Sequence, residues 1–149
     1  MKTYLKTLFV ILLLATNYCS EAQKMNKSSL QNAVTEIANL NIYETTFTVG
    51  YANIPSSQYQ RFNILISLAT DKELIMLAEE HKNPVVRLYS FQALKKRKIE
   101  IPSSLIEKFK IDENEVISLQ GCLAENTRVN QLSSEIFIPS SNYEFIKEY

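Results

Sequence analysis

The sequence predicts a mainly α-helical domain, and three observations lead to this prediction. Four segments, beginning at Ser28, Ser57, Thr70 and Ser104, place a Glu or Gln three positions after a Ser or Thr, the pattern that caps the first turn of a helix. Apolar residues then recur at intervals of three and four, as on one face of a helix. The chain of 149 residues has only 2 glycines, whereas average usage would give about ten. Nucleotide-binding glycine loops and α/β-hydrolase elbows are therefore excluded.

The N-terminal segment 1–22 is typical of a signal peptide. Two lysines precede the apolar run Leu8–Ala15, and small residues follow it up to Ala22, after which we expect cleavage. The run is too short to cross a bilayer, which takes roughly 20 residues. Lipid attachment at Cys19 is disfavoured because the bulky Tyr18 precedes it. We therefore expect export to the periplasm, the cell envelope or the medium.

The remaining chain, residues 23–149, has no composition break and is expected to form a single domain. The whole sequence carries 16 basic and 16 acidic side chains, so the basic excess that nucleic-acid binding requires is missing. A lone histidine, His81, excludes multi-histidine metal sites. No metal and no cofactor is expected. Cys122 has no cysteine partner after cleavage, and we expect it to be buried as a small apolar residue; a reactive or intermolecular thiol is the alternative.

The segment from Thr70 predicts two antiparallel helices joined by a short turn. After the cap at Thr70, the residues Leu74, Leu77, Ala78 and His81 recur at helical spacing and indicate one inward face. Asn83 and Pro84 then suit the start of the next helix. That second helix, VVRLYSFQALKKRK, is apolar over more than half its circumference, which indicates burial on both flanks.

The same stretch, from Thr70 to about Lys98, resembles a HEAT repeat. The resemblance implies a short solenoid of helical hairpins, which usually binds proteins rather than catalysing reactions. In the family, an aspartate in the turn typically pairs with arginines at the position of Arg87, whereas Asn83 stands there in this chain. The residues that carry the resemblance are Val86, Arg87, Ser90, Ala93 and Leu94, following Asn83 and Pro84.

Two minor extended segments interrupt the helices. Ile42–Ile54 alternates in polarity and is expected to be a strand or an ordered loop laid across the helices. Val116–Leu123 suits a short strand or a terminal repeat helix, and its periodicity does not decide between them. The aromatic-rich stretch Glu135–Tyr149 is expected to fold back over the core as irregular structure or a short strand.

The function that this pattern favours is that of an exported HEAT-like scaffold that binds another protein and has no catalytic activity. The expected contact stripe lies on the second helix, where Leu88, Gln92 and Lys96 are four residues apart and Tyr89 flanks them. An immunity or inhibitor protein that blocks a target by occlusion is a variant of this hypothesis.

Two hypotheses come from other classes. A small thiol- or histidine-dependent enzyme would use Cys122 and His81, which requires the fold to bring distant segments together. A carrier of an apolar ligand would instead need a cavity among the helices.

Overall fold

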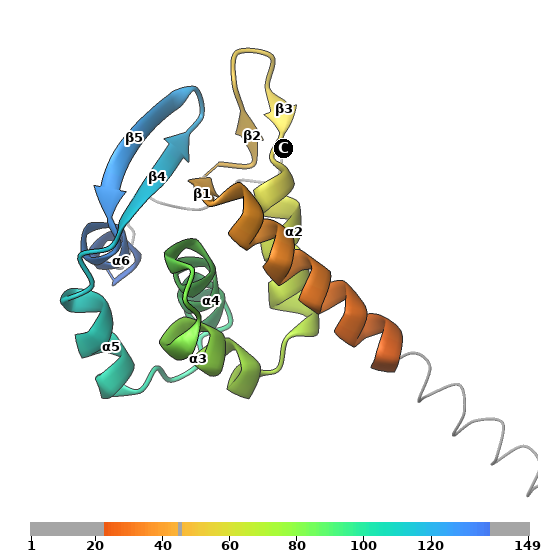
Figure 1. Cartoon of the computed structure of the whole chain (residues 1–149), viewed down its shortest axis with the longest axis vertical. Coiled ribbons are helices and arrows are strands. Elements are labelled where there is room, and N and C mark those ends of the chain that lie inside the picture. The colour runs from red at the N-terminus through yellow and green to blue at the C-terminus, as the bar shows by residue number, and fades with distance from the viewer. Residues whose placement is uncertain (1–22, 45, 138–149) are drawn as a thin grey trace, which may run out of the picture.

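The computed structural model describes residues 23–44 and 46–137, and Figure 1 shows their arrangement. The expected signal peptide, residues 1–22, and all but three residues of the stretch Glu135–Tyr149 lie outside the described residues. The described chain is mainly helical, as expected. Its helices are the N-terminal helix over residues 23–40, α2 (Ser57–Leu68), α3 (Asp71–Glu80), α4 (Pro84–Lys96), α5 (Ser103–Lys110) and α6 (Val129–Phe137).

The helices pair in chain order as hairpins. The N-terminal helix lies beside α2, with Gln58 donating to the carbonyl of Ile37 and Arg61 pairing with Glu36. The α3 helix packs against α4, and α5 packs against α6. Contacts of α4 with both α2 and α6, and of α3 with α5, join the hairpins side by side.

The α4 helix forms the centre of the core. Every residue from Val85 to Leu94 is buried, which confirms the expectation that its wide apolar face packs on both flanks. Phe91 stacks against Phe109 of α5, with ring centroids 4.3 Å apart, and Tyr89 contacts the rings of Tyr43 and Phe62. Because aromatic side chains bury large areas, this helix holds all the hairpins to one another.

The turn ends of the first and third hairpins are expanded into strands. Between the N-terminal helix and α2 lie β1 (Ile42–Glu44), β2 (Thr48–Val49) and β3 (Ile54–Pro55), and between α5 and α6 lie β4 (Glu115–Gln120) and β5 (Leu123–Arg128). The backbone N–H groups of Val129 and Asn130 donate to the carbonyls of Asn114 and Asp112. The β4–β5 hairpin therefore projects from a closed turn between two helices, and Figure 1 shows both expansions at one end of the molecule.

The two expansions meet in one sheet of order β1-β4-β5, beside a small β2-β3 hairpin. The β1 strand runs parallel to β4, with Ile42 opposite Ile117, and β4 runs antiparallel to β5. Both segments expected to be extended contain strands, but each is interrupted by a turn. Ile42–Ile54 contains β1, β2 and the first residue of β3, and Val116–Leu123 contains most of β4, a two-residue turn and the first residue of β5, so that the helix alternative is wrong. Tyr43 is buried beneath the sheet, where its hydroxyl donates to Gln92 of α4.

The helix starts confirm some of the expected caps and contradict others. Thr70 forms a full capping box with Glu73, and the Asn83 side chain accepts from the first turn of α4. Ser56 rather than Ser57 caps α2. The caps expected at Ser28 and Ser104 are wrong: residue 28 lies inside the N-terminal helix, and α5 starts after Pro102 without a side-chain cap. Such a short polar pattern also occurs by chance inside helices, and other contacts then determine where the helix begins and ends.

The expected binding stripe on α4 is not a free surface. Leu88 and Tyr89 are buried and Gln92 is 8% exposed, so that only Lys96 of the four reaches solvent. The prediction of an exposed stripe is therefore wrong, because neighbouring helices and β1 cover α4 all round. Lys96 lies over the rings of Tyr59 and Phe62 at the end of the helix.

The expectation that Cys122 is buried is wrong. It is exposed in the turn between β4 and β5, next to Gly121, whose φ of +61° suits a tight two-residue turn.

Among the residues that the structure describes, no helix combines the length and apolarity needed to span a bilayer.

Candidate functional site

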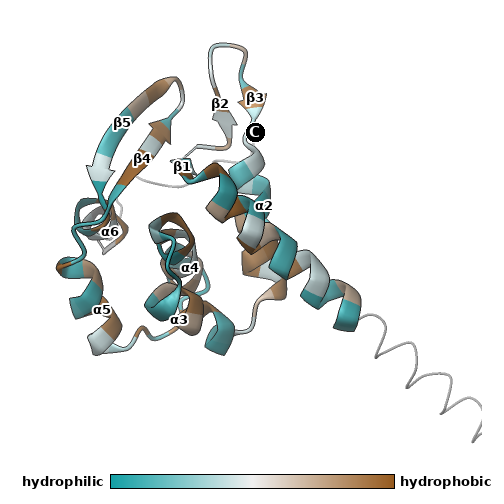
Figure 2. Cartoon of the chain, in the orientation of Figure 1, coloured by the Kyte–Doolittle hydropathy of each residue, from teal (hydrophilic) through white to brown (hydrophobic). Residues whose placement is uncertain are grey.

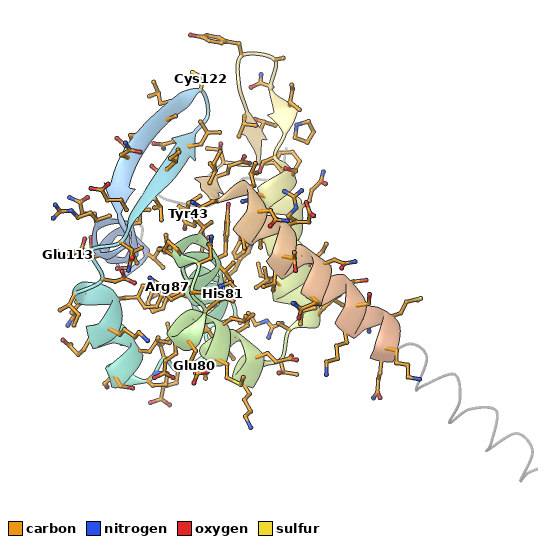
Figure 3. All side chains as sticks on the ribbon, in the orientation of Figure 1. Tyr43, Glu80, His81, Arg87, Glu113 and Cys122 are labelled. Carbon is orange, nitrogen blue, oxygen red and sulfur yellow. The ribbon has the colours of Figure 1, made fainter. Side chains whose placement is uncertain are left out.

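A cleft of about 440 Å³ opens between the turn that joins α3 to α4 and the turn that follows α5. Its lining comes from the C-terminal end of α3, from α4, from α5 and from the start of the β4 expansion. Figure 3 labels four of the residues that line it: Arg87 and His81 lie near each other, Glu113 lies by the turn after α5, and Glu80 lies at the end of α3. The lining residues are Glu79, Glu80, His81, Lys82, Arg87, Lys108, Ile111, Asp112, Glu113 and Asn114.

Arg87 holds the two turns together. One nitrogen of its guanidinium donates to the carbonyls of His81 and Lys82, at 3.0 and 3.4 Å. Another lies 2.5 Å from Oδ2 of Asp112, and both side chains are at least nine-tenths buried in this pair. A buried ion pair of this kind is costly to break because the remaining charge loses its partner. The floor of the cleft is thus fixed.

Asp112 is ionised in this setting. Burial by itself would raise the pKa of its carboxyl, but hydrogen bonds from Asn114 and Arg87 outweigh it and lower the pKa below the ordinary value. Its Oδ1 accepts from both the backbone and the side chain of Asn114. The carboxylate therefore organises the turn after α5 and is not free to act as a general acid.

His81 lies at the end of α3 as a neutral side chain. Burial lowers the pKa of its imidazole, and the nearby cations Arg87 and Lys82 lower it further. Its Nδ1 accepts a hydrogen bond from the backbone N–H of Asn83 at 3.1 Å, which requires that nitrogen to be unprotonated and leaves the proton on Nε2. His81 is thereby part of the turn that begins α4.

Asn83 ties the same turn to the first hairpin. Its Oδ1 accepts from the N–H groups of Val85 and Val86, while its Nδ2 donates to the carbonyl of Ala38 and to Oδ1 of Asn41. An aspartate here would lack those donors. The asparagine links the first hairpin to the second, and the Arg87–Asp112 pair links the second to the third.

The rim of the cleft carries the charges that remain accessible. Glu80, Lys82, Lys108 and Glu113 are exposed, and Lys108 donates to the backbone carbonyl of Glu79. Carboxylates and ammonium groups on either side of a fixed polar floor can pair with both signs of charge. Within the described residues, no group of three or more acidic, histidine or cysteine side chains is placed to hold a metal ion.

The residues expected for the alternative enzyme do not meet. Figure 3 shows Cys122 at the outer tip of the β4–β5 hairpin and His81 in the α3–α4 turn, far apart in the molecule. A thiol and an imidazole must lie within hydrogen-bond reach to form a nucleophilic pair. The arrangement therefore contradicts the pairing of these two side chains in one catalytic site.

Sequence reasoning identified His81, Asn83 and Arg87 but not their long-range partner Asp112. Asp112 lies 25 residues from Arg87 along the chain, so that no local spacing connects the two residues. Comparison with known proteins adds no family: no protein-family model matches the chain, and no curated protein matches it in sequence.

Proposed function

We propose that the chain is an exported, HEAT-like scaffold without catalytic activity of its own, which binds a polar segment of another protein in the cleft between its second and third helical hairpins. The observation that carries this proposal is that side chains connect neighbouring turns. Asn83 donates a hydrogen bond to Asn41, and Arg87 forms an ion pair with Asp112. Stacked helical hairpins with rigid, aligned turns present extended surfaces to partners.

The architecture supports the HEAT resemblance beyond the one matching segment. Helices of the first and third hairpins pack against α3 and α4 on either side, and strands connect their helices where α3 and α4 have a short turn. Arg87, at the position of the family's ladder arginine, is paired, although its acidic partner comes from the next hairpin's turn and not from residue 83. The resemblance implies a protein partner rather than a reaction.

The cleft suits a few side chains of a partner. A volume of about 440 Å³ lies within the range of roughly 300–1,000 Å³ that is usual for ligand sites. Its exposed rim carries the carboxylates Glu80 and Glu113 and the ammonium group of Lys82, so that a partner with both basic and acidic side chains would complement it. Such rim charges contribute to specificity and association rate more than to affinity.

Photo-crosslinking in the native host tests this proposal. A photoreactive residue replaces Lys82 at the cleft or, as a matched control, Lys72, an exposed lysine in the first turn of α3. We expect one defined protein adduct from position 82 and none from position 72. The double variant with Glu80→Lys and Glu113→Lys should lose that adduct. No adduct at position 82, or the same adducts at both positions, would contradict the proposal.

A further inference from the structure

Two hairpin turns, one from each expansion, touch each other at one end of the molecule. The N–H of Gly50, in the turn between β2 and β3, donates to the carbonyl of Gly121, in the turn between β4 and β5, at 3.0 Å. The N–H of Gly121 donates in turn to the hydroxyl of Thr46. Figure 1 shows both turns at the same border of the molecule. The two turns therefore form one surface, the paired tips, made of residues 46–55 and 117–124.

The paired tips are apolar, uncharged and exposed. Residues 46–60 and 116–124 contain no Asp, Glu, Lys, Arg or His, although charged residues make up 21% of the sequence. Figure 2 shows apolar colour at the β4–β5 tip and on β3. Exposed apolar surface gathered in one place marks an interaction site. Within the described residues, five of the nine large apolar side chains that are exposed lie here: Phe47, Tyr51, Ile54, Ile117 and Leu123.

The backbone of the tips is hydrogen-bonded within the molecule. Besides the two bonds that join the turns, the N–H of Asn53 donates to the carbonyl of Gly50, and the N–H of Ser56 donates to the carbonyl of Phe47. A polar backbone group that leaves water without another partner is costly, and lipid offers it no partner. Because these turn groups are already paired, the tips suit entry into a bilayer.

A lysine lies at the base of the β2–β3 hairpin. The Nζ of Lys96 is 5.9 Å from the ring centroid of Tyr59, and the ring of Phe47 meets the same Tyr59 ring edge-on, with centroids 5.3 Å apart. A basic group behind an apolar surface pairs with the phosphates of lipid headgroups while the apolar side chains lie deeper. The arrangement of charge therefore complements a bilayer surface.

We propose that the paired tips insert into the interfacial region of a lipid bilayer, with Tyr51 and Leu123 deepest and Lys96 at the headgroup phosphates. Tyrosine rings favour this region, where the ring is in apolar surroundings and the hydroxyl stays wet. Figure 1 shows both hairpins projecting from the helical body, and a fluid bilayer accepts projecting side chains without a complementary pocket. No residue of the tips lines the cleft, so this contact does not depend on the partner proposed there.

Flotation with vesicles of phosphatidylcholine and phosphatidylglycerol in equal amounts tests the insertion, in the chain as its host produces it. We expect the chain to float with the vesicles. Tyr51→Ser combined with Leu123→Ser should raise the Kd at least about tenfold, because two apolar side chains no longer leave water. The matched control, Met76→Ser combined with Ile111→Ser, removes two exposed apolar side chains from outside the tips and should leave the Kd unchanged. Lys96→Gln should raise the Kd about fivefold at low salt.

A fluorophore on the exposed thiol of Cys122, at the β4–β5 tip, tests the depth of insertion. In a Cys19→Ser background, nitroxide groups on the lipid acyl chains should quench it. A fluorophore on Lys72→Cys, in the first turn of α3, with Cys122→Ser added, should not be quenched. Absence of flotation would overturn the proposal and leave a protein as the occupant of the tips. Flotation unchanged by the double variant of Tyr51 and Leu123, or equal quenching at both positions, would also overturn it.

Discussion

The second and third helical hairpins differ in how their two helices are joined. The α3–α4 hairpin closes in a short turn whose polar groups are satisfied by Asn83, His81 and Arg87. The α5–α6 hairpin opens at the same place into β4 and β5, where exposed side chains predominate and one strand edge is open. Buried contacts are therefore concentrated in the middle hairpin, whereas the expanded turn carries mostly exposed side chains.

The largest expected effect comes from a charge placed in the centre of the middle hairpin. Leu88 is fully buried in α4, so Leu88→Asp should cost roughly 4 kcal/mol or more, through lost apolar burial and an unpaired carboxylate. Thermal unfolding followed by circular dichroism measures it. The matched control is Leu123→Asp in the β4–β5 hairpin, where Leu123 is 72% exposed and the cost should stay within about 0.5 kcal/mol. Equal melts for the two variants would contradict the comparison.

A smaller effect is expected from removing the Arg87–Asp112 ion pair, which joins the second and third hairpins. Arg87→Met leaves Asp112 buried without its cation and removes the hydrogen bonds to the carbonyls of His81 and Lys82, at a cost of about 3 kcal/mol. Urea unfolding of Arg87→Met, Asp112→Asn and the double variant forms a double-mutant cycle. We expect the double variant to be less destabilised than the two single costs added together, and strict additivity would show that the pair is not coupled.

A third variant tests how the middle hairpin is held to the first. Arg97, at the end of α4, donates to the carbonyls of Ile66 and Ala69 and pairs with Asp71 at 2.8 Å. Arg97→Ala should cost about 1–2 kcal/mol, the value of charged hydrogen bonds to helix-end carbonyls. Lys98→Ala, at the neighbouring exposed position, is the control and should change the unfolding midpoint little.

The smallest effect is a dependence of stability on pH in the turns around the cleft. The folded pKa values of His81 and Asp112 are both lowered, so the folded state binds fewer protons than the unfolded state, and stability falls as pH falls. The first loss of unfolding free energy, from His81, should begin as pH falls below about 6.5, the ordinary pKa of a histidine. The second loss, from Asp112, should begin below 3.8, the ordinary pKa of an aspartate. Urea unfolding at successive pH values measures both. His81→Gln should remove the first loss alone, and a first loss that persists in this variant would exclude His81 as its source.

The sequence predicted the middle hairpin well because its determinants are local. Thr70 with Glu73, and Asn83 with Pro84, are adjacent signals that act within one turn of helix. The periodic apolar face of α4 also predicted burial on both flanks. The same breadth of burial shows why a binding stripe through Leu88 was wrong: helical spacing identifies a row of residues but does not say whether a neighbouring element covers it.

The expanded turns were less predictable because their structure depends on distant partners. Ile42 of β1 lies opposite Ile117 of β4, a pairing that no local pattern encodes. Cys122 was expected to be buried because unpaired cysteines usually are. Instead, the two-residue turn that it forms with Gly121 places it at the exposed tip of the β4–β5 hairpin. The Arg87–Asp112 pair likewise joins segments 25 residues apart, so the cleft could not be assembled from spacing alone.

Native-state hydrogen exchange of individual amides tests the contrast between the hairpins most directly. Amides in the middle of α4, from Leu88 to Leu94, should exchange only through global unfolding, because every residue of this segment is buried. The amides of Ala124 and Asn126 in β5, an edge strand of the sheet, should exchange by local opening, many times faster. Exchange of the α4 amides by local opening, ahead of β4 and β5, would contradict the claim that the middle hairpin holds the molecule together.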